Sequence, residues 1–460
     1  MGAADNRSQS AEPSGPTRAE TIPSPDLPSS DFNDLHHRIE DKKYIVSLDV
    51  GTTTIRCIIY DEKAKVCSKA EENVVLVYPK LERVEIDPDD LWKKCLVVIK
   101  KAIHNAGLTA RQVHCMGLTT QRATFITWDR KTGKPLHNFI TWKDRRSDTL
   151  VKEYNNSWMM MGLRIGSTIL HKILRKSRYL AASVIRFANI QVTMRLKWVV
   201  ENNEEFKELL KTKDVLFGTV DTWLLYKLTQ GKVHATDYSN ASGTGFFDPF
   251  VLQWNAFFCK FLNLPMYMLP EVRDSVGDWG TCPAELFGAV IPITAVVSDQ
   301  GASLFGLGGT ARGEVKVTLG TGAFMNVNTG EKSHASVAGI YPVIGWKDRE
   351  GIAYMAEGSS NDNGTIVDWG KQVGFYNEPA ETAALAASVP DTNGVYFIPG
   401  FQGIQAPVND TFATGGFLGL NAEVEKPHLV RAMLESLAFR VAQIFETMRK
   451  EAKYELFNVR

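Results

Sequence analysis

The sequence has no excess of charge of either sign, because 52 lysines and arginines are balanced by 52 aspartates and glutamates. Such a chain lacks the basic surface that nucleic-acid binding needs, so we expect no nucleic-acid partner. Only 23% of its 460 residues are charged and 44% are hydrophobic. This balance argues against global disorder and favours a large buried core.

Cysteines and long apolar runs are also scarce. The six cysteines lie far apart without a CxxC pair, which excludes a zinc ribbon and a disulfide-dense secreted scaffold. No apolar run reaches the roughly 18 residues of a membrane-spanning helix, and the N-terminus lacks a signal-peptide pattern. We predict a soluble, cytoplasmic protein with reduced thiols and no transmembrane segment. Its oligomeric state stays open, and a homo-oligomer is compatible with the sequence.

The chain divides by composition into a tail and an α/β part. Residues 1–43 are rich in serine and proline and poor in large apolar residues, which predicts a disordered tail. From Tyr44 onward, short apolar strands alternate with a helix that Asp87 caps and Pro88 begins. This alternation predicts an α/β fold, with one domain over 44–307 and a second over 308–460.

Two turns rich in glycine and threonine are candidate phosphate sites. One follows the first strand as Asp49-Val50-Gly51-Thr52-Thr53-Thr54, and the other, Thr318 to Gly322, repeats the design in the second half. Glycine lets the backbone approach a ligand, successive N–H groups cradle an anion, and an aspartate can hold hydrated Mg²⁺. A polar hairpin is the alternative interpretation, and neither turn is a Walker A loop.

Polar residues at two further strand ends are candidates for substrate chemistry. Asp299 follows the apolar run IPITAVV, where a carboxylate can take a proton from an attacking hydroxyl; a helix N-cap is the alternative. Arg122 and Trp142 are able to bind a small polyol. The Arg122 guanidinium can donate hydrogen bonds to the polyol hydroxyls, and the Trp142 indole can cover the polyol carbon atoms. Alternatively, Trp142 belongs to the core and the basic residues after it are solvated.

Residues 154–200 contain no aspartate or glutamate but eight lysines and arginines. We predict a pair of solvated helices with cationic outer faces. A membrane-surface or partner-binding segment is the alternative.

The order and combined length of several stretches resemble the FGGY carbohydrate-kinase family and, within it, the glycerol kinases. Among these stretches are YIVSLDVGTTTIR, GLTTQRATFITWDRKTGKPLHNFITWKDRR, SDQGASLFG, TLGTGAFMNVNTG and GIQAPVNDTFATGGFLGL. The resemblance implies an actin-like ATPase fold, with two ribonuclease-H-like domains around a central cleft. It also implies phosphorylation of glycerol to glycerol 3-phosphate, with ATP and Mg²⁺.

The same resemblance assigns roles by motif position. It implies that Asp299 is the catalytic base and that Asp49 lies near the metal. The substrate-binding residues that it implies are Arg122, Trp142, Asp299, Gln300 and Phe324. The nucleotide-binding residues that it implies are Gly51, Thr52, Thr53, Thr54, Arg56, Gly320, Thr321 and Gly364.

Three features depart from the family pattern. Glycerol kinases carry glutamate after the Gln-Arg pair, where this sequence has Ala123, and Asp368 stands where the family usually has glutamine near the nucleotide. The family's adenosine-binding segment is expected directly after Arg460. Losing a buried acceptor costs on the order of 1–3 kcal/mol and loosens the assignment of glycerol. Two alternatives therefore stay open: a catalytically weak member that acts as an interaction or sensor protein, and a kinase for another polyol or a sugar.

Overall fold

The computed structural model describes residues 43–410 and 412–460. The tail predicted for residues 1–43 lies, apart from Lys43, outside the described residues. All six cysteines lie in the described part as free thiols. Within that part, no helix combines the length and the apolar character needed to cross a membrane.

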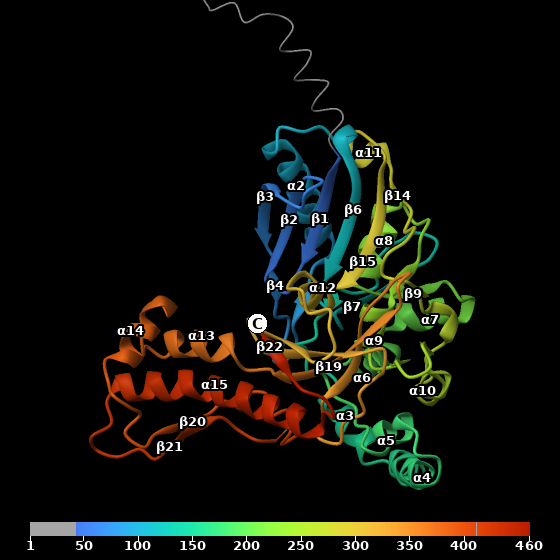
Figure 1. Cartoon of the computed structure of the whole chain (residues 1–460). Helices are drawn as coiled ribbons and strands as arrows, with labels where there is room; N and C mark the ends of the chain where they lie inside the picture. The colour runs from blue at the N-terminus through green and yellow to red at the C-terminus, as the bar shows by residue number, and fades with distance from the viewer. Residues whose placement is uncertain (1–42, 411) are drawn as a thin grey trace, which may run out of the picture. The chain divides into compact units, whose positions relative to one another are not determined.

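A six-stranded mixed sheet forms the first half, in the order β14-β15-β6-β1-β2-β3 (Figure 1). β1 pairs antiparallel with β2 and β2 with β3, whereas β6 runs parallel to both β1 and β15. The strands are β1 (Tyr44–Val50), β2 (Thr54–Tyr60), β3 (Val66–Asn73), β6 (Val113–Thr120), β14 (Thr281–Cys282) and β15 (Ile291–Ser298).

The local sequence explains these elements. Alternate residues of β1, among them Val46 and Leu48, are fully buried, as expected for a strand with one face on a core. Helix α2 (Pro88–Asn105) begins where the Asp87 carboxylate accepts two backbone N–H bonds, so the predicted cap is confirmed. Its Trp92 ring meets Trp223 of α8 (Val220–Leu228) edge to face at 6.4 Å, and the two helices share one core with the sheet.

A second core of the first half lies under a smaller sheet, in the order β4-β5-β8-β7-β9. Its strands are β4 (Leu76–Val77), β5 (Glu85–Ile86), β7 (Phe125–Asp129), β8 (Phe139–Ile140) and β9 (Val215–Thr219). The other elements of this half are α3 (Asp148–Asn155), α6 (Val192–Asn202), α7 (Glu204–Thr212), β10 (Ala235–Asp237), α9 (Tyr238–Ser242), β11 (Phe247–Asp248), β12 (Gln253–Trp254), α10 (Ala256–Phe261), β13 (Glu271–Arg273), α11 (Ala284–Phe287) and α12 (Asp299–Gly306).

The segment without acidic residues, 154–200, forms helices, as predicted, and part of its outer surface is cationic. It contains α4 (Trp158–Leu174) and α5 (Ser177–Ser183), followed by α6. Lys172, Arg175 and Lys176 are exposed, whereas Arg195 and Lys197 of α6 are buried. The outward face of α4 also carries exposed apolar side chains, which the composition of the segment did not predict.

The second half contains the sheet β18-β19-β17-β16-β22. β16 pairs antiparallel with β17 and β17 with β19, whereas β22 runs parallel to β16. The elements of this half are β16 (Glu314–Leu319), β17 (Ala323–Gly330), β18 (Tyr341–Lys347), β19 (Ile352–Ser360), α13 (Gly364–Gln372), α14 (Thr382–Ala387), β20 (Tyr396–Ile398), β21 (Gly416–Leu418), α15 (Lys426–Glu451) and β22 (Phe457–Val459).

The two large sheets repeat one topology. In each, three neighbouring strands pair antiparallel, β1-β2-β3 in one and β16-β17-β19 in the other, and a later strand adds parallel to the first of them. The α/β prediction is confirmed. Because of the repeat, the two glycine–threonine turns occupy equivalent places, between β1 and β2 and between β16 and β17.

Candidate active site

The first glycine–threonine turn joins β1 to β2. The Gly51 amide donates to the Thr54 carbonyl at 3.0 Å, which makes the turn a tight hairpin. The Thr52 hydroxyl donates to Oε1 of Gln121 at 3.1 Å and accepts from the indole nitrogen of Trp142 at 2.9 Å. The alternative interpretation, a polar hairpin, is therefore correct about the backbone. Its threonine side chains nevertheless line a cavity of about 900 Å³.

The second turn, Gly320 to Gly322, lines the same cavity. Helix α13 begins against it, because the Gly364 amide donates to the Gly320 carbonyl at 3.0 Å. A Cβ at position 364 would lie 2.9 Å from that carbonyl oxygen, so glycine permits this approach. Two turns with anion-cradling composition thus open into one cavity.

Asp299 is the first residue of α12 and lines the cavity from the end of β15. Ser298 is the N-cap, and its hydroxyl accepts from the Gly301 amide, so the capping role belongs to the neighbour of Asp299. Burial raises the pKa of the Asp299 carboxyl above its ordinary value, and the Arg122 guanidinium opposes that rise. A raised pKa suits a carboxylate that must accept a proton.

A buried polar network fixes the backbone before Asp299. The Ser298 amide donates to the Ser239 hydroxyl at 2.7 Å, and that hydroxyl donates to Asp237 at 2.7 Å. Ser275 donates to the same carboxylate, also at 2.7 Å. Sequence reasoning assigned no role to this network, although Asp237 and Ser239 lie within the run ATDYSNAS.

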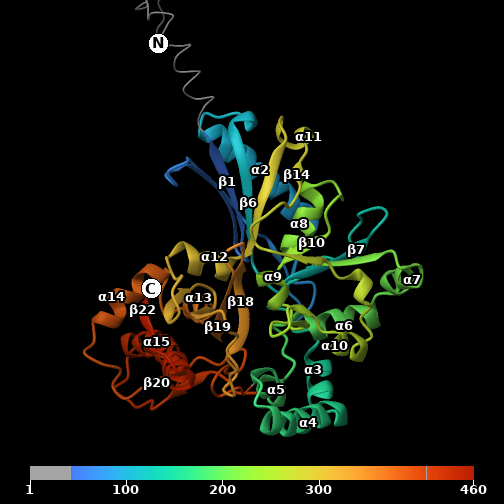
Figure 2. The same ribbon diagram turned by 45° about the vertical axis from the view of Figure 1, so that its right-hand side comes forward.

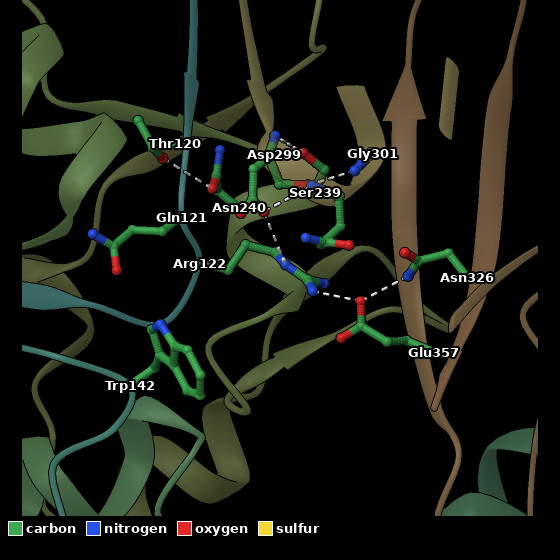
Figure 3. A network of polar contacts seen from close by, with 12 residues as sticks. Thr120, Gln121, Arg122, Trp142, Ser239, Asn240, Asp299, Gly301, Asn326 and Glu357 are labelled. Carbon is green, nitrogen blue, oxygen red and sulfur yellow. Dashed lines mark hydrogen bonds and ion pairs between the residues drawn. The ribbon is translucent and has the colours of Figure 1, made fainter. Parts of the chain in front are cut away.

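Arg122 joins the two halves of the site (Figure 3). Its guanidinium donates to Glu357 of β19 at 2.5 Å and lies 4.0 Å from Asp299. Glu357 also accepts from the Asn326 amide at 2.7 Å. The side chains of Arg122 and Glu357 are each only 10% exposed, so their ion pair is largely screened from water.

An aromatic pair closes one side of the cavity. The rings of Trp142 and Phe324 lie 6.0 Å apart, edge to face, and both residues line the cavity. Because the indole nitrogen of Trp142 donates to Thr52, the ring is held beside the first turn. The alternative that Trp142 is only a core residue does not account for this position.

Gln300, next to Asp299, reaches the second half of the chain. Its side-chain oxygen accepts from the Lys316 ammonium at 2.8 Å. With the oxygen engaged, the Gln300 amide nitrogen is the atom left to meet a ligand. Lys316 is 1% exposed, and burial lowers the pKa of its amine to about 8.

The lowered pKa of the Lys316 amine predicts that the stability of the protein depends on pH. Its pKa is about 8 in the folded protein and about 10.4 in an unfolded chain. Between these values the unfolded chain binds more protons, so the burial penalty of Lys316 is present at pH 7 and disappears as the pH rises. We expect the free energy of unfolding of the wild type to rise relative to that of Lys316→Met across this window, measured by urea denaturation at several pH values. A difference that is constant with pH would contradict the assignment.

Asp49 lies at the end of β1, electrostatically coupled to Asp299. Burial, with repulsion from Asp299, raises the pKa of Asp49 to about 6. The Arg56 guanidinium lies 3.6 Å from Asp49 and also 3.4 Å from Glu71. Within residues 43–410 and 412–460 there is no cluster of three or more His, Cys, Asp or Glu side chains able to hold a metal ion. Mg²⁺ is usually held by one or two carboxylates together with water and substrate phosphates, so Asp49 fits this role.

The structure brings most of the predicted residues together. Those that line the cavity are Thr52, Thr53, Arg122, Trp142, Asp299, Gln300, Gly320, Thr321 and Phe324. The predicted residues that do not line it are Asp49, Gly51, Thr54, Arg56 and Gly364. The roles of all these residues stay predictions.

Sequence reasoning missed Glu357 and Lys316. Lys316 lies between Val315 and Val317, and Glu357 follows the apolar run AYMA, so each charged side chain on its strand needs a partner. That pattern could have indicated a buried polar contact, but it does not show which residue is the partner.

A close approach of backbones at Gly301 gives a second prediction. A Cβ at position 301 would lie 2.2 Å from the Gly345 carbonyl oxygen of β18, whereas one at Gly306 in the same helix would meet nothing within 4 Å. We expect Gly301→Ala to lose about 1–3 kcal/mol of unfolding free energy through overpacking. Gly306→Ala is the matched control and should be neutral or slightly stabilising. Equal denaturation midpoints for the two variants would refute the steric argument.

Comparison with known proteins shows the family to which this chain belongs. The N-terminal domain model of the FGGY family of carbohydrate kinases matches residues 44–306, and the C-terminal domain model matches residues 315–459. The chain belongs to the FGGY family of carbohydrate kinases. The predicted family and the predicted actin-like ATPase fold are therefore confirmed.

Relatives of this FGGY kinase carry more specific names. Glycerol kinase 5 of Danio rerio is 45% identical over 417 residues, covering 91% of this chain and 79% of the relative. Glycerol kinase 2 of Thermotoga maritima is 37% identical, covering 91% and 81%. A crystal structure of Plasmodium falciparum glycerol kinase with ADP superposes with a TM-score of 0.77 at 30% identity, covering 90% of this chain and 80% of that one. As a kinase of this family, the protein is a phosphotransferase that uses ATP.

Proposed function

We propose that this FGGY kinase transfers the γ-phosphoryl group of ATP to a terminal hydroxyl of glycerol, giving glycerol 3-phosphate and ADP. One observation carries the proposal: Asp299 faces the same cavity as the two glycine–threonine turns. The relatives named glycerol kinase support glycerol as the acceptor.

The chemistry assigned to Asp299 is proton acceptance. The glycerol hydroxyl oxygen forms a bond to the γ-phosphorus while the bond from that phosphorus to the bridging oxygen of ADP breaks. The electron pair of the broken bond stays on ADP, and the hydroxyl proton passes to Asp299. The N–H groups and hydroxyls of the two turns stabilise charge on the moving phosphoryl group.

Other side chains bind and orient the acceptor. Arg122 donates to glycerol hydroxyls, as does the Gln300 amide nitrogen, while Trp142 and Phe324 cover the carbon chain. Ala123 lines the cavity without offering an acceptor, and Glu357 is the nearby carboxylate, already bound by Arg122. Glu357 therefore orients the guanidinium that holds the substrate.

Asp49 would hold Mg²⁺. When bound, this ion supplies positive charge that neutralises the phosphates. Without it, the coupled carboxylates of Asp49 and Asp299 repel each other, which fits a site that takes a cation.

Two further assignments belong to this proposal. We assign residues 44–307 to a first domain and residues 308–460 to a second. We also place the protein in the cytoplasm, because its cysteines are free thiols and four of them are buried.

An acceptor panel tests the proposal. The purified chain, with Mg²⁺ and ATP, should release ADP in proportion to added glycerol, and mass spectrometry should find glycerol 3-phosphate. ADP release that is faster with a ketose or a sugar acid than with glycerol would reassign the substrate. ADP release that no acceptor stimulates would favour an interaction or sensor protein.

A further inference from the structure

Helix α4 presents an apolar face to solvent. Five of its side chains occupy one stripe, spaced three or four residues apart, and all are exposed: Trp158 (84%), Met161 (42%), Ile165 (56%), Ile169 (53%) and Ile173 (69%). A surface helix normally turns such a stripe toward the core. Contiguous exposed apolar surface of this kind marks an interaction site.

The opposite face of α4 already has its partners. Met160 and Ser167 are buried, and Arg164 donates to the carbonyls of Ile185 and Asn155. The helix is therefore anchored with the apolar stripe outward. In Figures 1 and 2, α4 lies at the edge of the first half beside α5, and no other helix or strand of residues 43–410 and 412–460 is drawn over its outer side.

Within residues 154–200, the charges beside the stripe all have one sign. Residues 154–200 hold no aspartate or glutamate. Lys172, Arg175 and Lys176 lie exposed at the C-terminal end of α4, and no carboxylate of the described residues forms an ion pair with them. Arg178, next to them, is bound to Asp248.

We propose that α4 docks in the plane of a membrane surface that carries anionic lipids. An apolar stripe beside unpaired cations is what an interfacial helix requires, and tryptophan favours the boundary between headgroups and acyl chains. At 17 residues, with Arg164 and Lys172 within it, α4 lies on the membrane rather than crossing it. A second copy offers the same stripe and cations but no acidic residue within 154–200 to pair with them, whereas anionic lipid supplies the opposite charge.

Vesicle binding by the full chain tests the proposal. We expect the protein to sediment with vesicles of phosphatidylcholine and phosphatidylserine but not with phosphatidylcholine alone. Binding should weaken as salt is added, because salt screens the cations. Equal binding to both vesicle types, or to neither, would overturn the proposal.

Variants distinguish the contribution of the apolar stripe to vesicle binding from that of the cations. Ile165→Ser with Ile169→Ser should weaken binding about tenfold or more. Replacing Lys172, Arg175 and Lys176 by glutamine should weaken it about fivefold per charge removed. Phe439→Ser is the matched control, since Phe439 is 54% exposed on α15, and it should bind like the wild type.

Circular dichroism and glycerol kinase activity without vesicles establish that the variants fold, since none of these residues lies in the proposed site. Sedimentation velocity without vesicles tests whether a second copy of the chain, rather than a membrane, covers the apolar stripe. Self-association that the Ile165→Ser/Ile169→Ser variant abolishes would assign the stripe to a second copy and overturn the membrane proposal.

Discussion

Asp299→Asn should lower the rate of phosphoryl transfer by about 10²–10⁴-fold, the usual contribution of a positioned base. Asparagine keeps the shape of the side chain but cannot take the hydroxyl proton. The Ser298 cap and the network through Ser239 and Asp237 should hold the backbone unchanged, since none of these hydrogen bonds uses the Asp299 side chain. The expected loss is therefore in kcat.

The measurement is steady-state ADP release at saturating glycerol, together with calorimetry of Mg·ATP binding. Nucleotide affinity should stay near the wild-type value, because the two glycine–threonine turns that we propose to bind the phosphates are unaltered. Asp89→Asn, an exposed carboxylate in the first turn of α2, is the control and should be fully active. Transfer at the wild-type rate by Asp299→Asn would remove Asp299 from the chemistry.

Glu357→Leu should lower the free energy of unfolding by about 3 kcal/mol, because it leaves the Arg122 guanidinium buried without its closest carboxylate. The value is at the low end of the usual range, since Asp299 remains 4.0 Å from Arg122. Glu357→Gln should cost less, because its amide oxygen still accepts from Arg122 and Asn326. Urea denaturation measures these differences, and Glu350→Leu, at an exposed position between β18 and β19, is the control.

A double-mutant cycle distinguishes the ion pair from general packing. Arg122→Leu with Glu357→Leu should be clearly more stable than the sum of the single losses predicts, because it leaves no buried charge unpaired. Additive losses would show that the two side chains do not stabilise the protein as a pair.

The sequence predicted the local elements of this protein well, because local rules determine them. The strand before Gly51 and the cap at Asp87 follow from alternation and capping chemistry. The exposed cations at the end of α4 were predicted, but the apolar stripe beside them was not, since composition gives the number of cations in a segment and the helical period decides which side chains face outward.

The pairing of distant side chains was beyond the sequence. Arg122 and Glu357 are 235 residues apart, and Lys316 meets Gln300 across the two halves. The sequence around each of these side chains does not indicate its distant partner, because such contacts depend on how the two sheets pack.

Local patterns in the amino-acid sequence were enough to name the candidate parts: two glycine–threonine turns, a carboxylate at a strand end, and a segment without acidic residues over 154–200. The folded chain was needed to show that the turns share a cavity with Asp299, that Glu357 binds Arg122, and that α4 turns its apolar stripe outward. Propensity and periodicity act over a few residues, whereas burial and charge pairing act between surfaces that folding brings together.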